Sequence, residues 1–382
     1  MTPAHRNQAT GLPIAACMPV CYASTMIAVI DRRPRWKRLM AIVLGAVVTL
    51  ALVFAGVLML IEWKPGPVED TPVSGGGDRA LKPPVSLDLL SFNIGYGGLG
   101  RQADFFMDGG EQVRPERDAV EANLAAFGDV LRSHPADIVL LQEVDRDSSR
   151  SYGIDQAAAL AGVLPGFARS MALNFKVPWI PYPVLRPLGR VESGLLSLSR
   201  YPLGSAKRLQ LPGYYPWPVR VFHLKRCLHL LRFPAPDGKD WVIINLHLSA
   251  FDKGGRLRQE QMVYLKKLVM DLTGAGHHLI AGGDWNQAFP GIDGGTFAHG
   301  DPVPGWFQQM DPAWLPAGFR WAYDRMQPSL RAINKPYTPG ENFLTIVDGF
   351  LVGPGIEVLE VHTTNLGFAN SDHNPVLLRV RL

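Results

Sequence analysis

Residues 39–61, LMAIVLGAVVTLALVFAGVLMLI, place no charged side chain in 23 consecutive positions. At about 1.5 Å rise per residue, a helix of this length crosses the hydrocarbon core of a bilayer with some tilt. A buried core helix is one alternative, but such helices are usually shorter. A signal peptide is another, but the run exceeds a usual signal core and no small-residue cleavage site follows it. Trp36 and Trp63 flank the run, as interfacial residues do. We therefore predict an uncleaved transmembrane helix over residues 39–61.

Basic residues gather immediately before this run, in the sequence DRRPRWKR. Positive charge beside a transmembrane helix stays in the cytoplasm, so we expect the basic segment 1–38 inside and the chain after Glu62 outside, at the cell membrane. Residues 11–30 are also uncharged, but their prolines and polar residues make them a weak second span. Alternatively, residues 1–25 are untranslated sequence upstream of a true start at Met26. Both alternatives leave the large remainder of the chain outside the cytoplasm.

The formal charge of +4 is unevenly distributed. Up to Lys64, seven Lys or Arg side chains stand against two acids, so this segment carries +5 and the remainder carries −1. A near-neutral remainder lacks the broad basic field of non-specific nucleic-acid binders. The three cysteines, Cys17, Cys21 and Cys227, are too few for a disulfide framework, and their spacing makes a poor zinc site.

Residues 62–84 are rich in proline, glycine and charge, which is typical of an exposed linker. Apolar strands alternate with amphipathic helices over residues 85–382, and helical spacing of apolar residues is clearest over 115–134 and 258–272. No internal repeat or later composition break divides this region. We predict a single α/β domain over residues 85–382.

Polar side chains stand at the ends of six predicted strands. They are Asn93 in LDLLSFNI, Gln142 and Glu143 in IVLLQEV, Asn245 and His247 in WVIINLHL, Asp284 and Asn286 in LIAGGDWN, Asp348 in LTIVDGFLV, and Asp372 and His373 in SDHNPVLL. Any one of them is readily explained as a satisfied core or turn group. Together they favour a shared site, because buried carboxylates cost free energy unless they find a partner or a cation.

The chemistry of this set suits a hard divalent cation bound through oxygen. Magnesium is usually held by one or two carboxylates, which Glu143 and Asp372 provide, and manganese is the alternative. The sequence contains neither a His-x3-His nor a Cys-x2-Cys pattern, which argues against zinc. His247 and His373 remain for proton transfer and charge stabilisation.

Seven short motifs, SFN, QEVD, SGLLSLSRYP, INLHL, GGDWN, VDGF and SDHNP, occur in this order over residues 85–382. The series resembles the endonuclease/exonuclease/phosphatase superfamily, which includes deoxyribonuclease I, exonuclease III, inositol polyphosphate 5-phosphatases and neutral sphingomyelinases. The resemblance implies the family's fold, an α/β sandwich of two packed β-sheets flanked by helices. It also implies a magnesium-dependent phosphoric ester hydrolase, here preceded by one transmembrane helix.

The resemblance assigns the metal and the attacking water to five positions. Asn93 and Glu143 resemble the family's metal-site amide and carboxylate, with Asp372 contributing from the far side of the cleft. Asp284 resembles the residue that activates or positions the water, and Asn286 the amide that holds a phosphate oxygen.

Three further positions resemble the family's groups on the phosphate side. His373 resembles the histidine that contacts the scissile phosphate, Asp348 the acid that orients it, and His247 the histidine that stabilises or protonates that side. A metal and cationic donors would neutralise charge on the phosphate while an oriented water attacks in line. Such a mechanism needs no covalent intermediate.

Two segments are candidates for binding substrate. The glycine-rich loop 95–115 is longer than this connection usually is, and is either a lid or specificity element or a packed surface loop. The stretch 145–187 carries four candidate phosphate-binding residues, Arg146, Arg150, Asn174 and Lys176, which are alternatively ordinary surface residues. Its aromatic residues Phe175, Trp179 and Tyr182, if exposed, suit a lipid-facing rim or a stacking platform.

Three functions remain compatible with the sequence. The first is a membrane-anchored, metal-dependent phosphoesterase that hydrolyses phosphodiester or phosphomonoester bonds in phospholipid head groups or small phosphoesters. The second is an extracytoplasmic endo- or exonuclease, which needs a basic stripe along its cleft. The third is a catalytically silent binding module, against which the joint presence of Glu143, His247, Asp284, Asp348 and His373 argues. No protein partner can be inferred from the sequence.

Overall fold

The computed structural model describes residues 34–78, 80–250, 252 and 254–382. The weak second span considered for residues 11–30 lies outside this part of the chain. The chain divides into two compact units, residues 1–55 and residues 56–382. Helix α1 (Arg35–Ile61) carries the apolar run. Among the described residues it is the one helix long and apolar enough to cross a membrane.

The second unit contains two seven-stranded sheets. In spatial order, the first sheet consists of β1 (Val68–Asp70), β7 (Ser205–Gln210), β8 (Cys227–Pro234), β9 (Asp240–His247), β10 (His278–Asp284), β14 (Asp348–Val352) and β11 (Arg320–Ala322). The second sheet consists of β15 (Glu357–Thr363), β16 (Val376–Arg381), β3 (Ser86–Asn93), β4 (Ile138–Asp145), β6 (Gly189–Ser199), β5 (Ala168–Ile180) and β2 (Val73–Ser74). A separate small pair is formed by β12 (Leu330–Arg331) and β13 (Leu344–Thr345).

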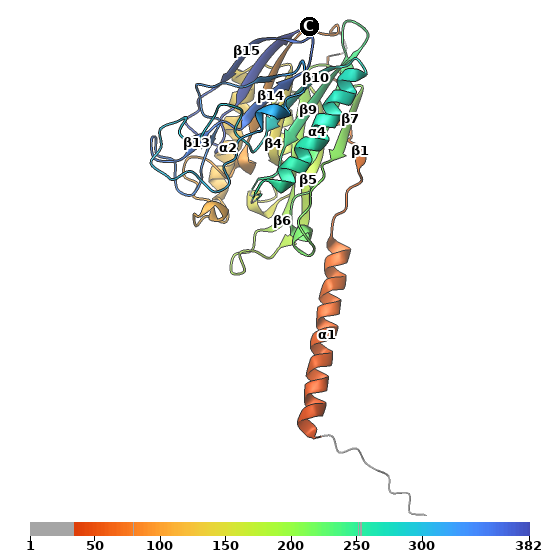
Figure 1. The fold of residues 1–382 in the computed structure, drawn as a ribbon, viewed down its shortest axis with the longest axis vertical. Coiled ribbons are helices and arrows are strands. Elements are labelled where there is room, and N and C mark those ends of the chain that lie inside the picture. The colour runs from red at the N-terminus through yellow and green to blue at the C-terminus, as the bar shows by residue number, and fades with distance from the viewer. Residues whose placement is uncertain (1–33, 79, 251, 253) are drawn as a thin grey trace, which may run out of the picture. The chain divides into compact units, whose positions relative to one another are not determined.

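Helices cover the outer faces of both sheets. Helix α4 packs on the first sheet, and α2 and α3 pack on the second (Figure 1). The helices are α2 (Arg117–Ser133), α3 (Gln156–Val163) and α4 (Arg256–Gly274), with short 3-10 turns η1 (Gly95–Gly97), η2 (Phe106–Asp108), η3 (Ser149–Ser151), η4 (Val219–Phe222) and η5 (Pro312–Trp314). The predicted sandwich of two β-sheets flanked by helices is confirmed.

Strand alternation separates the inner face of each sheet from the outer face. In β9, Trp241 and Ile243 belong to the apolar core between the sheets, whereas Val242 and Ile244 belong to the core under α4. Successive side chains of a strand point to opposite faces. The next inward positions of this strand are Asn245 and then His247, at the carboxyl end.

The same two-residue step brings polar residues of other strands to this end of the inner layer. Asn93 points to the same face of its sheet as the core residue Leu89 in β3, and Asp284 points to the same face as the core residue Ile280 in β10. Strand β3 is parallel to β4 in one sheet, and β9 is parallel to β10 in the other. The carboxyl ends of the two pairs meet, since Asn93 Nδ2 lies 3.0 Å from Asp284 Oδ2. A polar site therefore closes one end of an otherwise apolar layer.

Residues 62–84, for which the sequence indicates an exposed linker, take part in both sheets. Strand β1 pairs with β7, and β2 pairs with β5. The reason is that β7 and β5 would otherwise be edge strands, whose unpaired N–H and C=O groups accept short additional strands. The carboxylate of Glu62 is also buried, between Arg220 and Lys225.

Candidate active site

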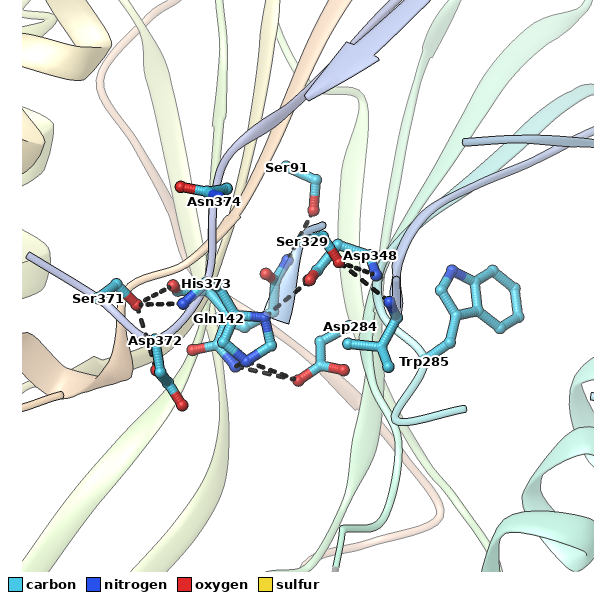
Figure 2. Close-up of polar contacts among 12 residues, drawn as sticks. Ser91, Gln142, Asp284, Trp285, Ser329, Asp348, Ser371, Asp372, His373 and Asn374 are labelled. Atoms are coloured by element: carbon cyan, nitrogen blue, oxygen red, sulfur yellow. Dashed lines mark hydrogen bonds and ion pairs between the residues drawn. The ribbon is translucent and has the colours of Figure 1, made fainter. Parts of the chain in front are cut away.

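Strands β10 and β14 place two buried carboxylates directly opposite each other, since Asp284 and Asp348 are register partners. Like charges in such a pair are destabilising unless a third group compensates them. His373, just before β16, supplies that group. Its Nδ1 lies 2.7 Å from Asp348 Oδ2, and its Nε2 lies 3.7 Å from Asp284 Oδ2. Figure 2 shows the imidazole between these carboxylates and Asp372, while Trp285 points away from them.

The carboxylates determine the charge of this histidine. Burial alone would lower the pKa of His373, but Asp348, Asp372 and Asp284 outweigh burial and raise the pKa to about 10. His373 is therefore a cation at neutral pH. Burial raises the pKa of Asp284 to about 7, with His373 opposing the shift and Asp348 adding to it. A carboxylate with a pKa near the working pH is suited to accept a proton from water.

Asn93 connects this group to a second cluster. Its Nδ2 lies 3.0 Å from Asp284 Oδ2, 3.3 Å from His373 Nε2 and 3.4 Å from Glu143 Oε1. Its Oδ1 accepts a hydrogen bond from the Gly95 N–H. The amide is therefore held from both ends and orients the acids around it.

Glu143 reaches the site through an irregularity in β4. The pairing of β4 with β6 shifts register between Leu141 and Val144, and Glu143 has a φ of 55°. A non-glycine residue with positive φ is strained, and such strain concentrates at functional positions. A bulge re-aims a side chain, and here it directs Glu143 to the same pocket as Asp372.

Glu143 and Asp372 form an oxygen-rich site that fits a divalent cation. Burial raises the pKa of Asp372 to about 6, with Glu143 adding to the shift while His373 and Arg331 oppose it. A cation placed beside Asp372 and Glu143 would relieve the repulsion that raises the pKa of Asp372. A second cluster with metal-ligand spacing consists of Asp284, Asp348 and His373, whose ligand atoms lie within 4.8 Å of one another.

His247 completes the group from β9. Its Nε2 lies 3.3 Å from Asp284 Oδ2 and 4.0 Å from Glu143 Oε1. Burial, reinforced by Arg226 and His373, holds the pKa of His247 well below its usual value, so the ring is neutral. Its Nδ1 has no hydrogen-bond partner within the described part of the chain.

Asn286 follows β10 and lines the same pocket. Its backbone N–H donates to Asp284 Oδ1 at 2.8 Å, and its Nδ2 donates to Leu248 O at 2.9 Å. The first of these bonds orients Asp284. The side-chain amide of Asn286, which the sequence predicted to hold a phosphate oxygen, therefore already donates a hydrogen bond to the loop after β9.

The predicted substrate-binding residues separate into two pairs. Arg150 and Asn174 line the pocket, whereas Arg146 and Lys176 are not among its lining residues. Both of these outer cations pair with Glu192 in β6, Lys176 at 3.4 Å. The sequence did not show this pairing because Glu192 lies on a different strand.

Arg150 is buried, and two of its nitrogens bond Asp145 at 3.0 and 2.9 Å. Its guanidinium also lies 3.8 Å from the centroid of the Tyr96 ring. The structure therefore uses much of the hydrogen-bonding capacity of Arg150 internally. Of the predicted aromatic rim, Trp179 and Tyr182 are exposed, and Phe175 is buried in an apolar cluster.

Arg226 was missed by the sequence analysis. It lines the pocket with only 9% of its surface exposed, and its Nη1 has no hydrogen-bond partner among the described residues. Burial lowers the pKa of Arg226, while Glu143 and Asp284 act in the opposite direction. The one sequence signal that could have identified Arg226 is its position as a basic residue directly before the apolar strand CLHLLRFP.

Gln142 and Asn245 do not line the pocket and have a structural role instead. Gln142 Nε2 donates to Asn245 Oδ1 at 2.8 Å, and Asn245 Nδ2 donates to the carbonyls of Leu141 and Leu196. These bonds connect the two sheets beneath the site. Asn245 is a satisfied core amide, one of the readings that the sequence left open, whereas Gln142 Oε1 has no hydrogen-bond partner among the described residues.

The fold and the site together define a two-sheet α/β protein with an acid and histidine centre of the phosphoesterase type. The chain belongs to the Endonuclease/Exonuclease/phosphatase family, whose sequence model matches residues 90–373. Members of this family are hydrolases of phosphoester bonds and depend on a divalent metal. A comparison with curated protein sequences finds no match.

Solved structures agree on the fold. An endonuclease/exonuclease/phosphatase from Beutenbergia cavernae is similar over 78% of this chain and 72% of its own, with a TM-score of 0.52 and 19% identity. A family protein from Leptotrichia buccalis is similar over 78% of this chain and 100% of its own, with a TM-score of 0.52 and 12% identity. Zebrafish (D. rerio) TDP2 complexed with a single-strand DNA product gives the same coverages, a TM-score of 0.50 and 12% identity.

Proposed function

We propose that this protein is a membrane-anchored, metal-dependent phosphoesterase that hydrolyses a phosphodiester or phosphomonoester by attack of water. The observation that carries the proposal is the convergence of Asp284, Asp348 and His373 with His247 and Glu143 at one pocket edge. Two carboxylates separated by one imidazolium match the needs of water activation on one side and phosphate binding on the other.

In this proposal Asp284 accepts the proton of the attacking water. His373, held as a cation by Asp348, receives a phosphate oxygen, and the neutral His247 donates a hydrogen bond on the same side. Glu143 and Asp372 would hold a divalent metal, magnesium or manganese. Asn93, whose Nδ2 faces Glu143 and whose Oδ1 accepts from the Gly95 N–H, would orient Glu143 beside that metal. That metal, when bound, neutralises charge on the phosphate.

The anchor is part of the proposal. Residues 39–61 of α1 are uncharged throughout, and Arg35, Lys37 and Arg38 precede them. We expect residues 1–38 in the cytoplasm and the hydrolase domain outside, together with residues 62–84, whose strands β1 and β2 join its sheets. A reporter enzyme active only outside the cytoplasm, fused after Leu382, tests the orientation. An inactive reporter on a membrane-inserted fusion would reverse the assignment.

The activity is tested on the full-length protein in a mild detergent, stripped of metal and then supplied with magnesium or manganese. The substrates are p-nitrophenyl phosphate, bis-p-nitrophenyl phosphate, phospholipid vesicles and plasmid DNA, compared in parallel. Asp284→Ala is the blank, and Asp271→Ala, an exposed acid on α4, is the matched control. We expect metal-dependent turnover in the wild type and the control but not in the blank.

The competing functions give different results in the same experiment. Preference for plasmid DNA over every small phosphoester would favour the nuclease. A structural neighbour, zebrafish TDP2, is itself complexed with a single-strand DNA product. A folded, metal-binding protein that turns over none of the four substrates would favour a silent binding module. Equal rates in wild type and Asp284→Ala would remove Asp284 from the mechanism.

A further inference from the structure

The site opens into a pocket of about 600 Å³ that has two chemically different parts. One part holds the acids, histidines and Arg226 described above. The other part is walled by apolar side chains from three separate segments, namely Phe105, Phe106, Ile180, Leu188, Phe222 and Leu224. The volume lies within the usual range of ligand pockets. A polar substrate would leave its donors and acceptors unpaired against these walls, at a cost in free energy.

The mouth of the apolar part is also apolar, although it faces solvent. Met107 in η2, Tyr182 after β5 and Val219 in η4 line the pocket with 47%, 61% and 45% of their surfaces exposed. Val184 and Leu185, at the turn between β5 and β6, are almost fully exposed. Large apolar residues gathered at one opening mark a contact with a membrane or another apolar partner.

Chain connectivity links one side of this mouth to the end of the apolar run. Glu62 is the first residue after the apolar run of α1, so a chain that crosses a bilayer with residues 39–61 places Glu62 at its surface. The Glu62 side chain is 4% exposed, and its carboxylate lies 2.8 Å from Arg220 Nε. Arg220 belongs to η4, next to Val219. The ion pair therefore keeps η4, and with it Val219 at the mouth, close to Glu62.

The polar end of the same pocket offers a place for an anion. Arg226 Nη1 lacks a hydrogen-bond partner in the described ranges, although the side chain is more than nine-tenths buried. A phosphate oxygen would supply that partner, because guanidinium and phosphate form strong charge-assisted hydrogen bonds. The pocket is therefore amphipathic, with an anion-binding end and an apolar end.

We infer that the apolar part of the pocket is a subsite for the hydrocarbon chain of a lipid phosphoester from the bilayer that holds the protein, with its phosphate between Arg226 and His373. The inference rests on the proposed function and specifies its substrate class. Hydrolysis adds one water across the P–O bond: the water oxygen joins phosphorus, and the leaving alcohol takes a proton. No other reactant is needed.

The test measures chain-length dependence with p-nitrophenyl alkyl phosphodiesters carrying methyl, butyl or octyl chains, each below its micelle-forming concentration. Full-length protein in lipid nanodiscs is used, with bound metal. Each buried methylene is worth a factor of up to about four in kcat/KM, so we expect the octyl probe to exceed the methyl probe by at least about tenfold. For Val219→Glu or Met107→Glu, we expect the octyl-to-methyl ratio to fall to about one.

Val263→Glu is the matched control, because Val263 is an exposed apolar residue of α4 that does not line the pocket. It should keep the wild-type ratio. A wild-type ratio near one, with metal-dependent turnover of the methyl probe intact, overturns the chain subsite and leaves the phosphoesterase standing. A ratio that survives both mouth substitutions also overturns it. Absence of turnover of every probe overturns the phosphoesterase and the inference with it.

Discussion

His229, a histidine buried in the core, makes the stability of the protein depend on pH. The size of the expected change in the free energy of unfolding follows from the structure. The side chain is 0% exposed in β8, and its Nδ1 lies 2.9 Å from Ser197 Oγ. Its Nε2 lies 3.2 Å from both Ser170 Oγ and Thr71 Oγ1. Burial lowers the pKa of His229 from 6.5 to about 3, so the ring is neutral in the folded protein at any moderate pH.

The unfolded chain restores the ordinary pKa of this histidine. Between about pH 6.5 and pH 3 the unfolded state binds a proton that the folded state excludes, so the free energy of unfolding falls as pH falls. For a folded pKa of about 3, the loss between pH 7.5 and pH 5 is about 2 kcal/mol from His229 alone. The raised carboxyl pKa values in the active site act in the opposite direction. Only a comparison with a variant isolates the histidine.

The assay is urea unfolding of the full-length protein in a mild detergent, followed by tryptophan fluorescence at both pH values. In His229→Gln the replacement keeps polar contacts but does not titrate. We expect the wild type to lose about 2 kcal/mol more than this variant between pH 7.5 and pH 5. His362→Gln, a half-exposed position in β15, should behave as wild type. Equal losses in wild type and His229→Gln would refute the reasoning.

Three further changes have defined outcomes. Asp348→Asn removes the carboxylate 2.7 Å from His373, and we expect turnover to fall by about 10² to 10⁴ with an unchanged circular dichroism spectrum; a rate near wild type would exclude the pair from catalysis. Glu143→Gln should weaken magnesium or manganese binding in calorimetry by more than the roughly tenfold loss typical of residues behind the ligands, and unchanged affinity would place the metal elsewhere. Gly283 has a φ of 144°, and a Cβ added there would lie 2.0 Å from a carbonyl oxygen of β9. Gly283→Ala should therefore lower the free energy of unfolding in urea by about 3 kcal/mol or more. Gly162→Ala, whose added Cβ meets open space, should not lower it.

Local patterns predicted much of the fold and the polar edge. Asn93, His247 and Asp284 stand at two-residue steps from apolar core positions, so the strand period alone directs them to the inner face. The helical spacing over residues 115–134 and 258–272 likewise corresponds to α2 and α4. Such patterns can be recognised from the sequence because they depend only on residues that are close together in the chain.

Other parts of the site depend on strand pairing between distant segments. Asp284 faces Asp348 because β10 pairs with β14, and that register sets the electrostatics of His373. Arg146 and Lys176 are occupied by Glu192 for the same kind of reason. The periodicity of a single segment contains no information on these pairs. Sequence patterns could therefore identify the individual residues as candidates but could not predict which residues contact each other.

The sequence by itself determined the apolar run, the alternation of strands and helices, and the residues at the strand ends, because each follows from the periodicity or composition of a short segment. Only the tertiary structure decided which acids lie together, such as Asp284 and Asp348 on either side of His373. It also decided that short apolar pieces of η2, the turn after β5 and η4 meet beside Arg226 in one pocket. The physical reason is that a pocket is built from contacts between segments far apart in the chain, whose relative positions are set by sheet register and core packing.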